Sequence, residues 1–158
     1  MHKYFQSKIR IIFITVIITI FLFSCGKEEH NIIPETYVDF TIRLNDPLFV
    51  DLNSVLNSVI VTNQYEGINS AGYKNHGIIV FRASQTEFYA FDRTCTFEEE
   101  LNIAVNLENT VDLTAECPNC GSEYILPSYA VPGNDGPAVH PLKQYYAEFD
   151  GNTVWVHN

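Results

Sequence analysis

The stretch CPNCGSEYILPSYAVPGNDGPAVHPL, residues 117–142, decides how the rest of the chain is interpreted. It opens with Cys117 and Cys120, two thiols separated by two residues, and continues with Gly121-Ser122. Glycines and prolines recur in the second half of the stretch, where Gly136-Pro137-Ala138 lies. Because glycine and proline favour turns and loops, we expect one loop that carries the two thiols and a second, glycine-bearing loop after it.

The segments around this stretch have the pattern of strands. In YVDFTIRL, residues 37–44, apolar and polar residues alternate, which is typical of a half-buried strand. Asp150-Gly151 predicts a hairpin. Further segments rich in β-branched or aromatic residues are predicted strands: 58–63, 77–83, 87–93, 102–108, 110–116, 123–126, 143–149 and 153–157. A short helical turn is expected within 51–58 and an exposed loop over 63–77, so the pattern indicates an all-β domain.

The first 24 residues have the features of a signal peptide. Lys3, Lys8 and Arg10 precede the apolar run IIFITVIITIFLF, residues 11–23, and no acidic residue occurs before it. Thirteen residues of helix reach only about 20 Å, whereas the hydrocarbon core of a bilayer is about 30 Å thick. We therefore predict a removable signal peptide rather than a membrane-spanning helix.

The end of this segment, Leu22-Phe23-Ser24-Cys25, resembles the lipobox of bacterial lipoproteins, in which the cysteine is acylated and becomes the mature N-terminus. The resemblance implies that Cys25 carries a lipid anchor in the membrane. The next residues, Gly26-Lys27-Glu28-Glu29, are similar to signals that send some lipoproteins to the outer face of the outer membrane. We expect an outer membrane lipoprotein that faces the cell surface or the periplasm, with a tether over 25–36 and a β domain over 37–158.

The charge of the mature chain limits the kinds of partner that we expect it to bind. The whole chain has 9 basic and 19 acidic residues, and removal of 1–24 leaves 6 basic and 19 acidic residues, a net charge of −13. Such a charge disfavours nucleic acid and anionic lipid surfaces. No Ser-His-Asp constellation, His-Glu-x-x-His motif or phosphate-binding glycine loop occurs, so we do not expect an enzyme. The expected partner is an unidentified envelope protein or ligand.

Three segments together carry a resemblance to a known family. YAFDRTC (89–95), CPNCGSEY (117–124) and GPAVHPLKQY (136–145) occur in the order found in the Rieske iron–sulfur domain, and the similarity covers about 40–156. The resemblance implies an antiparallel β-sandwich with a small inserted subdomain of the cluster-binding type. Its two metal-binding loops would be those around 95–97 and 117–122.

In the Rieske family one loop reads Cys-x-His and the other Cys-x-x-His-Gly-Ser, and two cysteines hold one iron while two histidines hold the other. Cys95 and Cys117 match the thiolate ligands, but the histidine positions fall on Phe97 and Cys120. Phenylalanine has no lone pair for a metal. The signal also lacks the twin arginines typical of Rieske proteins exported in the folded state. We therefore expect a Rieske-like domain that has lost its 2Fe–2S cluster, holds no cofactor and serves a binding or scaffolding role.

Three alternatives remain open at this point. A 2Fe–2S electron-transfer protein would use Cys95, Cys117 and Cys120 with a fourth ligand, for which His140 is the only histidine near the motif. CPNCG also resembles one knuckle of a zinc ribbon, although structural zinc takes four ligands. A redox-active Cys117-Cys120 pair would need a low thiol pKa, which such motifs usually obtain at a helix N-terminus.

The three cysteines of the mature body are also candidates for a disulfide, because an envelope compartment oxidises thiols. The Rieske resemblance implies that Cys95 and Cys117 hold the same iron, which keeps their sulfurs close. Without the metal the two sulfurs could bond if their Cα atoms lie about 4.4–6.8 Å apart. A Cys95–Cys117 bridge would close 23 residues. It would contribute about 3 kcal/mol in the chain-entropy model. We expect this pairing, with Cys95–Cys120 as its competitor.

Overall fold

The computed structural model describes residues 32–97, 102–108 and 112–158, which belong to the compact unit Asn31–Asn158. The predicted signal peptide, Cys25 and most of the predicted tether lie outside the described residues. Among the residues that are described, no helix has the length and apolar character needed to cross a membrane.

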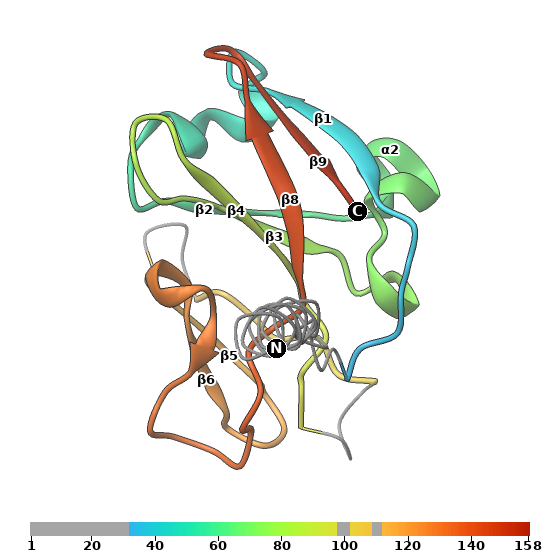
Figure 1. Cartoon of the computed structure of the whole chain (residues 1–158), viewed down its shortest axis with the longest axis vertical. Helices are drawn as coiled ribbons and strands as arrows, with labels where there is room; N and C mark the ends of the chain where they lie inside the picture. Colours follow the sequence, from blue (N-terminus) through green and yellow to red (C-terminus); the bar gives the residue numbers. More distant parts are fainter. Residues whose placement is uncertain (1–31, 98–101, 109–111) are drawn as a thin grey trace, which may run out of the picture. The chain divides into compact units, whose positions relative to one another are not determined.

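The described strands form two antiparallel sheets (Figure 1). The larger sheet has six strands in the order β1-β9-β8-β4-β3-β2, and the smaller has three in the order β5-β6-β7. The strands of the larger sheet are β1 (Asp39–Arg43), β2 (Ser58–Val61), β3 (Ile78–Arg82), β4 (Phe88–Asp92), β8 (Gln144–Phe149) and β9 (Thr153–His157). Those of the smaller sheet are β5 (Thr114–Glu116), β6 (Glu123–Ile125) and β7 (Val131–Pro132).

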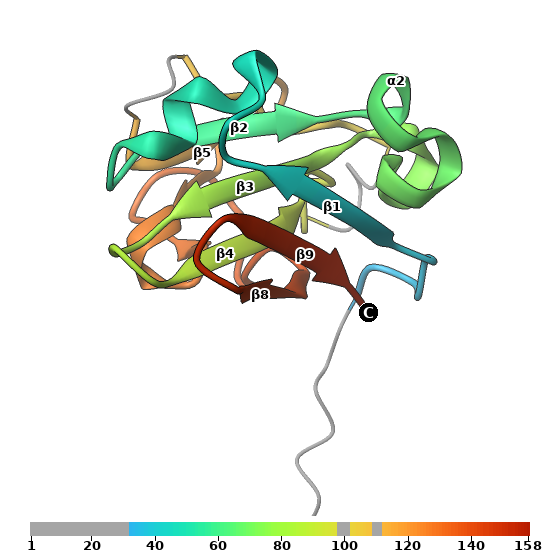
Figure 2. The same cartoon turned by 90° about the horizontal axis from the view of Figure 1, so that it is seen from above.

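The larger sheet bends where β4 meets β8. These two strands pair at only two positions, Ala90 with Tyr145 and Phe91 with Gln144, whereas β1 and β9 pair over five. Figure 2 shows β2, β3 and β4 side by side, with β9 beside β1. The bend brings apolar side chains from both halves into one core, for example Phe40 and Val156 from one half and Val59 from the other.

Which residues of a strand are buried depends on whether one or both of its faces are covered by other segments. In β1, Phe40 and Ile42 are buried while Thr41 and Arg43 are exposed, as the alternating sequence predicts. Every residue of β3 and β4 is buried, because both faces of these strands are covered. One face contributes to the core of the larger sheet and the other to a second core shared with the smaller sheet.

The second core places the smaller sheet against β3 and β4. Phe81 and Phe91 from the larger sheet pack there with Ala115 and Tyr124 from the smaller one. In the sequence the smaller sheet lies between β4 and β8. The predicted all-β antiparallel fold with a small inserted subdomain is therefore confirmed.

Three segments differ from their predictions. Residues 102–108 form no strand and contribute only isolated bridges, Thr94 to Ala104 and Asn106 to Glu116. The helical turn predicted within 51–58 starts earlier, as the 3₁₀ helix η1 (Pro47–Asn53), because the side chain of Asp46 caps it by accepting a hydrogen bond from Leu48 N at 2.9 Å. The predicted loop over 63–77 contains short helices: α2 (Asn63–Glu66), η2 (Gly67–Ser70) and η3 (Tyr73–Asn75). A further 3₁₀ turn, η5 (Leu126–Ser128), follows β6.

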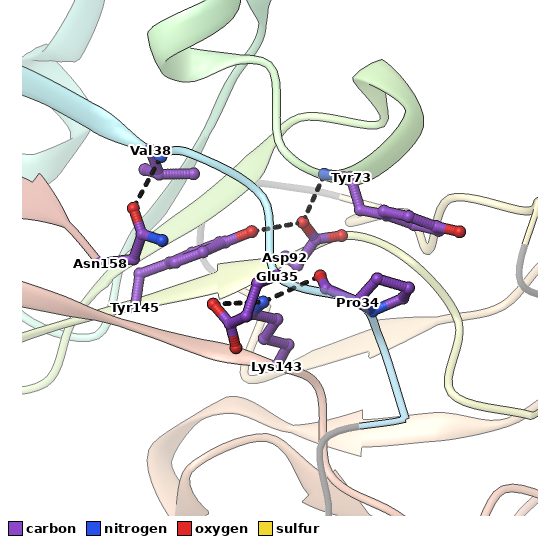
Figure 3. A network of polar contacts seen from close by, with 8 residues as sticks. All are labelled: Pro34, Glu35, Val38, Tyr73, Asp92, Lys143, Tyr145 and Asn158. Carbon is purple, nitrogen blue, oxygen red and sulfur yellow. Dashed lines mark hydrogen bonds and ion pairs between the residues drawn. The ribbon is translucent and has the colours of Figure 1, made fainter.

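A buried carboxylate fixes the 63–77 connection to the sheet. Asp92, at the end of β4, is fully buried and accepts hydrogen bonds from Tyr73 N at 2.7 Å and from Tyr145 Oη at 2.8 Å (Figure 3). It also accepts a hydrogen bond from Thr94 N at 2.9 Å. Burial is the largest cause that raises the pKa of Tyr145, and the nearby charge of Asp92 adds to it. The hydroxyl therefore stays protonated and acts as a donor. One side chain thus joins β4, β8 and η3.

The described N-terminal residues are held beside the same network (Figure 3). The Lys143 side chain is only 3% exposed, and its Nζ donates to the carbonyl oxygen of Pro34 at 2.9 Å. The same nitrogen lies 3.1 Å from the exposed Glu35 carboxylate. Farther along, the Asn158 side chain accepts a hydrogen bond from Val38 N at 2.9 Å. Both ends of the domain are therefore fixed to the sheet.

Candidate metal centre

Three cysteines meet at one point between the two sheets. Cys95 follows β4, Cys117 follows β5, and Cys120 lies in the turn between β5 and β6. Their sulfur atoms all lie within 4.8 Å of one another, and the Cys95 and Cys120 sulfurs are 3.6 Å apart. Cys95 and Cys117 are fully buried, whereas Cys120 is partly exposed. The three thiols are thus close enough to bind one metal ion.

The turn that carries Cys117 and Cys120 is closed by backbone hydrogen bonds. Cys117 N donates to Ser122 O at 2.9 Å, and Gly121 N donates to Cys117 O at 3.0 Å. Gly121 has a φ of +70°, a left-handed conformation that glycine adopts without strain. The Ser122 hydroxyl lies 3.1 Å from the Cys120 sulfur.

The glycine-bearing loop packs on this turn. A Cβ atom at Gly136 would overlap the backbone and side chain of Ser122, and Gly136 has a φ of +81°. Ala138 N donates a hydrogen bond to Ser122 Oγ at 3.0 Å. The loop at 136–138 therefore covers the cysteine turn and fixes the orientation of its serine.

Tyr124 is a residue of the site that the sequence did not single out. Its side chain is fully buried, and its hydroxyl lies 3.4 Å from the Cys95 sulfur. The hydroxyl oxygen accepts a hydrogen bond from Thr96 N at 3.0 Å and lies 3.0 Å from Thr96 Oγ1. Burial raises the pKa of Tyr124 and keeps its hydroxyl protonated. Three apolar residues follow Glu123 in EYIL, residues 123–126, so no polar–apolar alternation in the sequence pointed this side chain inward.

The surroundings of the thiols change their acidity in opposite directions. Burial raises the pKa of Cys95 to about 12. Burial also acts to raise the pKa of Cys120, but hydrogen bonds from the side chain and backbone of Ser122 outweigh it, and the pKa is lowered. Cys120 therefore ionises more readily than Cys95 and is also the more accessible of the two.

The two positions on which the sequence resemblance would place histidines, Phe97 and Cys120, both border the second core. Phe97 packs against the second core, as Cys120 does, and offers no ligand atom. The carbonyl oxygen of His140 accepts a hydrogen bond from Thr96 Oγ1 at 2.6 Å. Within the described part of the chain, no histidine, carboxylate or further cysteine joins the three thiols as a fourth ligand.

The cysteines are free thiols in this structure. The predicted Cys95–Cys117 disulfide stays a prediction, and so does its competitor. The 3.6 Å sulfur separation shows that Cys95 and Cys120 also lie near each other. Acylation of Cys25 lies outside the described residues and is likewise a prediction.

A comparison with protein-family models and with the sequences of curated proteins finds no match. The resemblance to Rieske domains therefore stays a prediction from the motifs of the sequence.

Proposed function

We propose that this protein is a lipid-anchored protein of the bacterial outer membrane whose β domain is Rieske-like but holds no 2Fe–2S cluster. Its role is to bind or scaffold another component of the envelope, a protein or a ligand. The observation that carries the proposal is the composition of the site: three thiols converge, and Phe97 and Cys120 stand where the resemblance would need two histidines.

The ligand count supports the loss of the cluster. A 2Fe–2S cluster takes two protein ligands on each of its two irons. Cys95 and Cys117 would supply one pair, and among the described residues Cys120 alone remains near them for the second iron. A cluster bound this way would leave one iron with an open position, which disfavours a stable electron carrier.

The arrangement of the loops supports the Rieske-like part of the proposal. In the resemblance, Gly136-Pro137-Ala138 match the proline loop that covers the cluster of a Rieske domain, and in this chain 136–138 packs on Ser122. Two cysteine-bearing loops that lie far apart in the sequence also meet. Cys95 and Cys120 follow different strands, and their sulfurs lie 3.6 Å apart. Both features agree with the order of motifs in the sequence.

The alternative is an electron-transfer protein with an atypical 2Fe–2S ligand set. One observation favours it: hydroxyl groups lie beside two of the sulfurs. The Ser122 hydroxyl is next to the Cys120 sulfur, and the Tyr124 hydroxyl is next to the Cys95 sulfur. Hydrogen bonds to sulfur tune the potential of iron–sulfur clusters. This alternative requires a fourth ligand from outside the group of three thiols.

Restoring the two histidines tests the proposal. The double variant Phe97→His, Cys120→His carries the Rieske ligand set, so anaerobic reconstitution with iron and sulfide should give it a 2Fe–2S cluster with a visible absorption band. The unchanged protein should gain none. Phe97→Leu with Cys120→Ser alters the same positions without adding ligands and is the matched control.

Each other outcome has a separate meaning. A cluster in the unchanged protein would favour the electron-transfer alternative. Failure of a folded double variant to assemble any cluster would count against the Rieske-like relation, because the loops would then not have the metal-binding geometry of that family.

A further inference from the structure

We propose that Cys95, Cys117 and Cys120 bind a single Cu(I) ion. The inference deepens the proposed binding role and rests on it, but it does not depend on the lipid anchor. The proposed site holds one metal ion, so its ligands need to surround only one point. An iron–sulfur cluster needs ligands on two irons.

The sulfur positions fit one metal ion. An ion bonded to three thiolates at about 2.3 Å, the length of a zinc–thiolate bond, holds the sulfurs about 4 Å apart. In the structure the Cys95 and Cys120 sulfurs are 3.6 Å apart, and the three sulfurs lie within 4.8 Å of one another. The printed separations therefore lie on either side of the value that one bound ion requires.

The number and type of ligands select the metal. Thiolates are soft ligands that favour Cu(I), zinc and iron–sulfur clusters over harder ions. Structural zinc takes four protein ligands, whereas the described residues bring three to this site. Three thiolates complete the trigonal coordination that Cu(I) accepts, so Cu(I) needs nothing that the site lacks.

Two hydroxyl groups are positioned to stabilise the bound thiolates. Ser122 Oγ accepts a hydrogen bond from Ala138 N, which leaves its own hydrogen free to point at the Cys120 sulfur 3.1 Å away. Tyr124 Oη accepts from Thr96 N and lies 3.4 Å from the Cys95 sulfur. Three thiolates and one Cu(I) carry a net charge of −2, and donors of this kind offset the cost of holding that charge in a buried site.

Access to the site is through Cys120. Its side chain is partly exposed, while those of Cys95 and Cys117 are fully buried. Binding releases one proton from each thiol that is protonated beforehand, as three copper–sulfur bonds form. No electrons are transferred, because the ion enters and stays as Cu(I). A disulfide between any two of the cysteines removes two ligands, so oxidation of the empty site blocks binding.

A competition titration tests the inference. The mature protein is purified in detergent, reduced without oxygen, freed of metal and titrated with Cu(I) against a chromogenic Cu(I) chelator. We expect one Cu(I) per chain and a sulfur-only coordination shell of three atoms in X-ray absorption. Cys120→Ser should weaken binding by at least about 100-fold, and Ser122→Ala by about 10- to 100-fold. Ser128→Ala alters an exposed serine of η5 and should leave the affinity unchanged.

The result that would overturn the inference is a reduced, folded protein that takes up no stoichiometric Cu(I). Zinc bound at one per chain in preference to Cu(I) would also overturn it, as would equal Cu(I) affinities of the Ser122→Ala and Ser128→Ala proteins. These failures differ from failure of the proposed function, which would be seen as iron and sulfide bound to the unchanged protein in the reconstitution.

Discussion

Gly136 packs directly on Ser122, so closely that a Cβ atom at position 136 would overlap the backbone and hydroxyl group of the serine. Ser122 in turn lies 3.1 Å from the Cys120 sulfur through its hydroxyl. The glycine contact therefore connects the covering loop to the thiols. It explains why this position must lack a side chain.

Gly136→Ala should damage the domain more than a glycine replacement elsewhere. Gly151, in the β8–β9 hairpin, also has a positive φ but has open space where a Cβ would lie, so Gly151→Ala is the matched control. Both variants are strained by about 1–3 kcal/mol. Gly136→Ala should lose at least about 1 kcal/mol more, because its methyl group must displace Ser122. Urea unfolding of both proteins measures the difference, and equal unfolding free energies would mean that the contact is not tight.

Tyr124→Phe should destabilise the domain by about 1–3 kcal/mol. The change removes the hydroxyl that accepts from Thr96 N, and this buried amide is then left without that acceptor. Tyr146 is 68% exposed, so Tyr146→Phe is a control expected to stay within about 0.5 kcal/mol of the unchanged protein. Similar midpoints for the two variants in urea would show that the Tyr124 hydroxyl contributes little.

Asp92 and Tyr145 should be energetically coupled. Tyr145 Oη donates to the buried Asp92 carboxylate at 2.8 Å. Hydrogen bonds to charged groups contribute about 1.5–3 kcal/mol. Asp92→Asn and Tyr145→Phe should each destabilise the domain, and the double variant should lose less than the sum, by about 0.5–3 kcal/mol. A double-mutant cycle in urea measures this coupling, and strict additivity would mean that the pair acts independently.

The strands that are half-buried or flanked by clear turns were predictable from the sequence. The alternation around Phe40 and Ile42 and the Asp150-Gly151 turn led to β1 and to the β8–β9 hairpin, because local period and turn chemistry determine these elements. The strand pattern placed the cysteines in loops that follow strands, but their convergence on one site was implied only by the Rieske resemblance.

Other features depend on contacts between distant segments, so no local pattern encodes them. The helices within 63–77 are fixed in part by Asp92, which lies 19 residues after Tyr73 and accepts its backbone hydrogen bond. Residues 102–108 have strand-like composition but make only isolated bridges there. Tyr124 became a site residue only through its contact with Cys95, 29 residues away.

Replacement of Cys25 tests the lipid anchor. Since acylation at this residue would hold the mature protein in the membrane, Cys25→Ser should block processing or release the protein to the soluble fraction of the envelope. Cys120→Ser, which removes a thiol of the folded domain, is the control and should leave membrane partitioning unchanged. A Cys25→Ser protein that is fully processed and stays in the outer membrane would show that Cys25 is not the anchor.

The most direct test of the loss of the cluster is to measure iron and acid-labile sulfide in the protein as it occurs in the cell. The mature protein should be expressed with its own signal, extracted anaerobically from the envelope, and analysed for iron, sulfide and a reduced-state electron paramagnetic resonance signal. We expect neither iron nor sulfide in stoichiometric amounts and no signal, because the part of the chain that the structure describes brings only three ligands to the site. Two irons and two sulfides per chain, with a reduced-state signal, would show that the domain is an iron–sulfur protein after all.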